Sequence, residues 1–169
     1  YRFIPIQNKI SSTDIGLVDA DELYTKMKDL YKWDALKRDD YFVDYQNMYT
    51  FLGVLSQRQM FVSAANALMA EGEDEKAVEM LDLCQERFPD TNFPLESIPL
   101  GFSGNDYMVA QMVEDYYYLG ETEKARDLGI RMCAALHETA AFYLDWGELG
   151  SAEFETAGRV LLYIADVMK

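Results

Sequence analysis

Apolar residues recur every three or four positions along most of the chain, which is the period of an amphipathic helix. The first such stretch covers residues 20–31, with Asp19 as its N-cap and acidic residues in its first turn. Its apolar stripe consists of Leu23, Met27, Leu30 and Tyr31. The same period predicts further helices at residues 46–71, 74–87, 104–119, 122–145 and 151–168. The pattern therefore predicts an all-α fold.

Breaks in the pattern predict where these helices begin and end. Gly72 and Gly120 follow helical stretches as C-terminal cap residues, and Pro89 ends the helix that starts near residue 74. We expect a bend at Gly53 and an N-cap at Ser151. The buried stripe of the last helix is predicted to contain Phe154, Ala157, Val160, Leu161, Ile164 and Val167.

The segments between the helices have different patterns. Residues 1–18 show no helical period, and the opening "YRFIPI" around Pro5 suits an extended segment. Residues 32–44 mix charged and aromatic residues and are predicted to be a packed connection. Residues 90–103 contain two prolines and a glycine, and we expect a loop.

One hexapeptide pattern, Gly-Glu-x-Glu-Lys-Ala, occurs twice, starting at Gly72 and at Gly120. Each copy lies between two predicted helices, so the turn is short and the two helices must pack antiparallel. Ala77 and Ala125 stand five residues after the glycines, where a small side chain lets two helices approach closely. We therefore expect two helix-turn-helix units, at residues 58–89 and 106–136, in a single domain spanning 1–169.

These units resemble the tetratricopeptide repeat, whose helix pairs stack into a right-handed array. The first unit has apolar, small and terminating residues where the repeat has them, at Phe61, Ala65, Leu68, Leu81, Cys84 and Pro89. The second unit matches at Val109, Val113, Tyr116, Gly120, Ala125 and Met132. It departs from the repeat at Gly129, where a large residue is usual, and at His137, where proline would end the helix. The second helix is therefore expected to continue past His137.

The whole chain also resembles a narrower family. "YRFIPI", the acidic and aromatic connection, "QRQMFVSAANALMAEGEDEKAVEML" and the Tyr-rich helix are similar to the soluble C-terminal region of certain bacterial multi-pass membrane proteins. These proteins form a family of unknown function related to protein O-mannosyltransferases. The resemblance implies a parent whose membrane part is a lipid-sugar-dependent glycosyltransferase, with this region on the periplasmic or extracytoplasmic side. Because the chain opens on Tyr1 without an initiator Met, we expect it to be a fragment.

The net charge of the chain limits which classes of partner it can bind. The 169 residues include 30 acidic and 15 basic side chains, for a net charge of −15, which repels nucleic acid and anionic lipid. The same charge steers a basic protein or peptide toward the surface. The apolar runs are too short to span a membrane, so we expect no direct insertion by this fragment.

Residues that could carry chemistry are few. His137 is the only histidine and lies four positions after Cys133, but no further ligand pair completes a metal site. Cys84 and Cys133 are expected to be free thiols. Glu114 and Asp115, beside the "YYY" run, resemble the acid-plus-aromatic pattern of a sugar-cleaving site. We expect no cofactor, no metal and no catalysis by this fragment, with a carbohydrate-processing or glycan-binding domain as the alternative.

The first helix of each unit is the candidate binding surface, because in tetratricopeptide repeats this helix lines a groove that holds a peptide. The corresponding residues here are Gln59, Val62, Asn66, Met69, Tyr107, Ala110, Glu114, Tyr117 and Tyr118. Of the three consecutive tyrosines, Tyr116 shares the apolar stripe and is expected to be buried. The sequence thus predicts a non-catalytic interaction or scaffolding module, unless neighbouring helices fill the groove and the region is a structural cap on its own membrane domain.

Overall fold

The computed structural model describes residues 19–44, 47–48, 53–97 and 104–169, and every regular element in these ranges is a helix. The six longer helices are α1 (Ala20–Thr25), α3 (Arg58–Ala70), α4 (Asp74–Arg87), α5 (Asn105–Tyr118), α6 (Thr122–Leu144) and α7 (Ser151–Val167). Shorter helical turns cover Lys26–Leu30, Asp34–Lys37, Leu55–Gln57 and Gly147–Gly150. The all-α prediction is confirmed. The predicted extended segment 1–18 lies outside the described residues.

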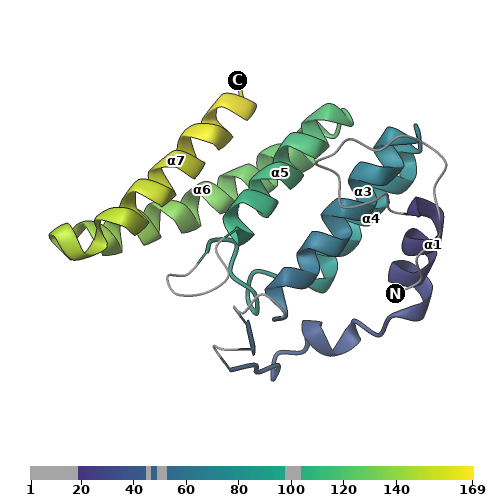
Figure 1. Ribbon diagram of the computed structural model, residues 1–169, viewed down its shortest axis with the longest axis horizontal. Coiled ribbons are helices and arrows are strands. Elements are labelled where there is room, and N and C mark those ends of the chain that lie inside the picture. The colour runs from purple at the N-terminus through teal and green to yellow at the C-terminus, as the bar shows by residue number, and fades with distance from the viewer. Residues whose placement is uncertain (1–18, 45–46, 49–52, 98–103) are drawn as a thin grey trace, which may run out of the picture.

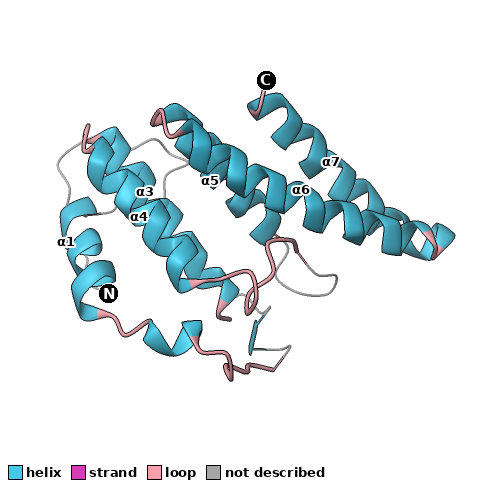
Figure 2. Ribbon diagram, turned by 180° about the vertical axis from the view of Figure 1, so that it is seen from behind, coloured by secondary structure: helices cyan, strands magenta, loops and turns pink. Residues whose placement is uncertain are grey.

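The helices lie side by side across the molecule in the order of the chain (Figures 1 and 2). α3 packs along α4, α5 packs along α6, and α7 packs on both α5 and α6. α3 also contacts α5, and α1 lies against α3 at the opposite end of the molecule from α7. The first helices of the two predicted units are therefore neighbours.

The two copies of the hexapeptide form the same turn. Gly72 has φ +78° and Gly120 has φ +80°, a left-handed conformation that glycine adopts without strain. The amide of the residue after each glycine donates to the carbonyl five residues earlier, that of Leu68 in one turn and of Tyr116 in the other, at 2.9 and 2.8 Å. This is the hydrogen bond of a Schellman cap, and it closes both α3 and α5.

The alanine of each hexapeptide lies at a helix contact, as predicted. Ala77 and Ala125 are both fully buried in the hydrophobic core. The preceding lysines also occupy similar environments, since Lys76 bonds to Asp21 of α1 at 3.0 Å and Lys124 bonds to Asp82 of α4 at 2.8 Å. Each turn thus links its second helix to the helix before the pair.

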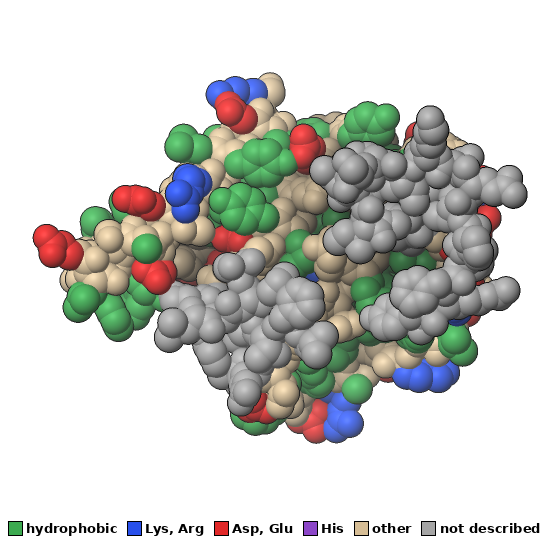
Figure 3. All heavy atoms as spheres, viewed as in Figure 1, with side chains coloured by type: hydrophobic (Ala, Val, Ile, Leu, Met, Phe, Trp, Pro, Cys, Tyr) green, Lys and Arg blue, Asp and Glu red, His purple; other side chains and the backbone are tan. Residues whose placement is uncertain are grey.

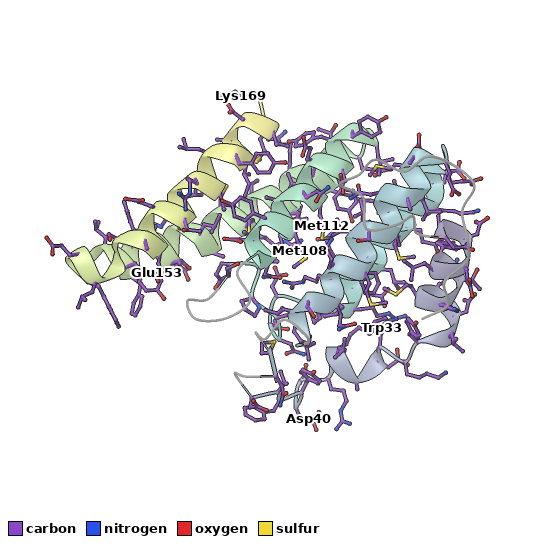
Figure 4. The ribbon with its side chains drawn as sticks, viewed as in Figure 1. Trp33, Asp40, Met108, Met112, Glu153 and Lys169 are labelled. Carbon is purple, nitrogen blue, oxygen red and sulfur yellow. The ribbon has the colours of Figure 1, made fainter. Side chains whose placement is uncertain are left out.

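The core continues from the helix pairs into the connection before them. The Trp33 ring packs on Phe61 and Phe88 with centroids 5.2 and 6.2 Å apart, and its indole donates to the Met27 carbonyl at 2.8 Å. Trp33 lies below the α3–α4 pair in Figure 4. Asn92 donates to the Leu36 carbonyl at 2.7 Å. These contacts confirm that residues 32–44 form a packed connection.

The loop after α4 is held by a buried arginine. Arg58, at the start of α3, is 2% exposed, and its guanidinium donates to the carbonyl oxygens of Phe93 at 3.1 Å and Pro94 at 2.6 Å. It also donates to Oδ1 of Asn105 at 2.8 Å, and Asn105 donates to the carbonyls of residues 94–96. The buried charge is stabilised because these oxygens satisfy its donors. This network fixes the start of α5 against the start of α3.

Some predicted boundaries and burials were wrong. α3 begins at Arg58, after a bend at Gly53 and a short turn over 55–57; residues 45–46 and 49–52 lie outside the described ranges. Ser151 is the first residue of α7, and Gly150 is the N-cap. The Ser151 hydroxyl donates to the Glu148 carbonyl at 3.0 Å and does not cap an amide of α7. Three residues of the predicted stripes are exposed: Leu30, Tyr31 and Phe154.

The departures of the second unit from the repeat pattern have a structural cause. α6 continues past His137 to Leu144, as expected. Gly129 is buried beneath the end of α7, where a Cβ atom would stand 2.8 Å from Sδ of Met168. A larger residue at this position would force the Met168 side chain to move, so glycine leaves room for that side chain to pack on α6.

Candidate functional site

The nine residues predicted to line a groove differ widely in exposure. Gln59, Tyr107, Glu114 and Tyr118 are exposed, whereas Asn66, Met69 and Tyr117 are half-buried. Val62 and Ala110 are fully buried in the core and cannot contact a separate partner in this conformation, which corrects their assignment to an open surface. The close approach of α3 to α5 buries them.

Three of the nine residues meet at one hollow. Met69, Glu114 and Tyr118 line it together with Ala70 and Asp115, at the carboxyl ends of α3 and α5. Its volume is about 310 Å³. α3 supplies the apolar wall and α5 supplies the acidic and aromatic wall. The hollow therefore combines side chains of both predicted units.

Asp115 is the unusual group in this hollow. Its side chain is only 6% exposed, and among the described residues its Oδ2 has no hydrogen-bond partner. Burial, and after it the nearby charge of Glu114, raises the pKa of Asp115 to about 7. Glu114 itself accepts a hydrogen bond from the Tyr163 hydroxyl, which connects α5 to α7. α7 thus reaches the acidic wall, while Tyr118 remains 77% exposed.

The three consecutive tyrosines at the end of α5 divide between core and surface. Tyr116 is fully buried, as predicted, and its hydroxyl donates to Asp82 Oδ1 at 2.9 Å. The same hydroxyl accepts from Gln85 at 2.8 Å, so Tyr116 joins α5 to α4. Tyr117 is half-buried and packs on the core. Tyr118 alone points its ring into solvent as a free contact surface.

Methionines fill the opposite side of α5. Met108 and Met112 are 5% and 2% exposed and lie between α5 and the α3–α4 pair in Figure 4. Because both are buried, this side of α5 belongs to the core. Only the edge that carries Glu114 and Tyr118 is accessible.

The cysteines and the histidine form no reactive arrangement. Cys84 and Cys133 are free thiols, as expected, and burial raises the pKa of Cys84 to about 12, which opposes formation of the nucleophilic thiolate. His137 is exposed on α6. Within the described ranges, no three His, Cys, Asp or Glu side chains gather in a way that could hold a metal ion.

Two further surfaces were not identified from the sequence. A larger open hollow of about 1050 Å³ lies between α1 and the start of α3, and Gln59 and Trp33 are among the residues that line it. Hydrophobic side chains also lie exposed where α6 turns into α7 (Figure 3). They are Phe142, Leu144, Trp146 and Leu149. Their exposure depends on where α6 ends, which periodicity alone does not specify.

The carboxylates of the α5 hollow do not resemble the arrangement of a glycosidase. Glu114 and Asp115 are adjacent on one helix, and the facing wall consists of Met69 and Ala70. Glycoside hydrolysis uses two carboxylates that flank the bond to be cleaved. The lining of this hollow suits the binding of a positively charged group better than acid–base catalysis.

Comparison of the chain with protein-family models, with curated proteins and with solved structures found no match. No helix in the described part of the chain is both long and apolar enough to cross a membrane.

Proposed function

We propose that this chain is a non-catalytic interaction module that binds a protein or peptide partner along the exposed edge of α3 and α5. The observation that carries the proposal is the hollow formed jointly by Met69, Glu114 and Tyr118, which occupy groove positions in the two repeated units. Repeat arrays of helix pairs generally provide binding surface and not reactive groups. The exposed ring of Tyr118 offers a large contact area with a polar end.

The proposal includes a tetratricopeptide-like arrangement. Two helix pairs with the same glycine turn, the same buried alanine and neighbouring first helices support it. α7 then acts as the first helix of a further, incomplete pair, because it packs on both helices of the preceding pair. We propose further, on the resemblance of the sequence alone, that the module belongs to a larger membrane glycosyltransferase-like protein and lies outside the cytoplasm.

Site-specific photocrosslinking tests the proposal and separates it from a structural cap. A photoreactive amino acid replaces Tyr118, and in a control it replaces Ile130, which is 59% exposed on α6. The full-length natural protein carrying each replacement is irradiated in cells. We expect position 118 to give a crosslink to a separate protein, and position 130 to give none.

Two other outcomes contradict the module. A crosslink from position 118 only to other parts of the same chain identifies a cap on the protein's own domain. Equal crosslinking from positions 118 and 130 indicates contact without a specific face.

A further inference from the structure

The hollow at the carboxyl ends of α3 and α5 contains a buried acid that nothing in the described protein neutralises. Asp115 is 6% exposed, and its Oδ2 accepts no hydrogen bond from the described residues. Burying a carboxylate without a partner destabilises a protein strongly, so such a group calls for an explanation in binding. Oδ2 itself is buried, but Asp115 is among the residues that line the open hollow, so a group bound there would lie against it.

The surroundings of Asp115 favour a positive charge. The second acid of the hollow, Glu114, lies beside it, and none of the described residues that line the hollow is Lys, Arg or His. α3 and α5 both end here, so the negative ends of two helix dipoles point toward the site. Neither helix has a basic residue in its last turn to balance this potential.

We propose that this hollow binds a lysine side chain of the partner, with its ammonium group paired to Asp115. This inference rests on the proposed function and names the chemistry that its binding edge recognises. Only 6% of the Asp115 surface is exposed, which suits the compact ammonium of lysine better than the broader guanidinium of arginine. Met69 and Ala70 cover the apolar stem, and the Tyr118 ring offers a face for the cation.

Binding depends on pH because Asp115 must be ionised. Burial and Glu114 raise the pKa of Asp115 to about 7, so the carboxylate predominates only above neutral pH. The other groups facing the site are Glu114 and Tyr118 on α5 and Tyr163 on α7, and α3 contributes only Met69 and Ala70. Burial and the Glu114 contact raise the pKa of Tyr163, so this phenol stays neutral near pH 8. Lysine binding is therefore expected to strengthen as the pH rises through about 7.

An NMR titration with a single lysine side chain tests the inference. The probe is N-acetyl-lysine methylamide, and N-acetyl-norleucine methylamide is the neutral control of similar shape. We expect the lysine probe to shift the amide signals of Met69, Ala70, Glu114, Asp115 and Tyr118 near pH 8. Asp115→Asn should weaken this binding at least about tenfold, as expected for a hydrogen-bonded charge pair, whereas Asp29→Asn, an exposed acid on another element, should not.

Several outcomes overturn the inference. They are an absence of lysine-specific shifts, equal binding of the norleucine probe, and equal weakening by Asp29→Asn. If the lysine probe binds only after Arg2 and Lys9 are both replaced by Gln, the chain's own basic residues occupy the site, and the partner proposal is overturned. If Asp115→Asn retains the partner fully, lysine recognition is refuted but the proposed function is not. If a photoreactive residue at position 118 gives no crosslink in the otherwise wild-type protein, the proposed function itself is refuted.

Discussion

Replacing Asp115 by Asn should stabilise the protein above neutral pH. The pKa of Asp115 rises from its ordinary value of 3.8 to about 7 in the folded state. Between these values the folded protein holds a proton that the unfolded chain has released. Stability from this group is therefore complete at low pH and is lost as the pH rises through about 7.

The size of this effect follows from the same two values. Each pKa unit corresponds to about 1.4 kcal/mol, so the full loss is roughly 4 kcal/mol, and about 2 kcal/mol of it falls between about pH 5.5 and pH 8. Asn has nearly the same shape and cannot ionise. Its amide remains without a partner, but a neutral group costs less to bury than a charge.

Urea denaturation of the wild-type protein, Asp115→Asn and Asp29→Asn at the two pH values measures this difference. Asp29 is an exposed acid, so its variant has the same net charge as Asp115→Asn but keeps the titration of Asp115. We expect Asp115→Asn to gain about 2 kcal/mol on the control between the lower and the higher pH. Parallel pH dependence in all three proteins would show that Asp115 is not buried without a partner in solution.

Five further substitutions test the packing, each by denaturant melts. Ala77→Leu and Ala125→Leu should each destabilise the protein by about 1–3 kcal/mol, because both positions are fully buried at helix contacts; neutrality of both would contradict the helix register. Tyr116→Ala should cost about 3–5 kcal/mol, while Tyr118→Ala, at an exposed position, should change stability by less than about 0.5 kcal/mol. Arg58→Met should cost about 3 kcal/mol or more, since it leaves carbonyl oxygens of the loop after α4 without their donor; an unchanged midpoint would refute a structural role for this arginine.

Local signals in the sequence were sufficient for the turns. Gly72 and Gly120 each end an apolar period and begin an acidic stretch, and both take the positive φ that this pattern predicts. Tyr116 was also predictable, because its burial follows from the spacing of its own helix. These features depend on residues within one or two helical turns.

Features that depend on distant residues were not predictable. Arg58 looks like a surface residue by its type, and its acceptors lie more than 30 positions away in the loop after α4. Gly129 departs from the repeat pattern, and the sequence does not show that Met168, 39 positions later, packs over it. Val62 and Ala110 were assigned to a groove from the repeat register, which does not reveal how closely α3 approaches α5.

The candidate site was predicted only in part. Met69, Glu114 and Tyr118 were identified from the register, and the structure brings them to one hollow. Asp115 was singled out only as a possible sugar-cleaving acid beside Glu114, and its burial was not predicted because it depends on the packing of α5 against its neighbours. Tyr117 was also assigned to the groove, but it packs on the core, so a change there would affect stability as well as binding. Tyr118 is the better position for testing binding.

The most direct test of the interaction module is to measure partner capture and thermal stability together for Tyr118→Ala. The full-length protein is purified from its natural source strain with wild-type, Tyr118→Ala or Ile130→Ala sequence, and co-purifying proteins are quantified by mass spectrometry. We expect a specific partner to be lost with Tyr118→Ala and kept with Ile130→Ala, while both variants melt at the wild-type temperature, because both side chains are exposed. Retention of every co-purifying protein by Tyr118→Ala at wild-type levels would contradict binding along the edge of α3 and α5.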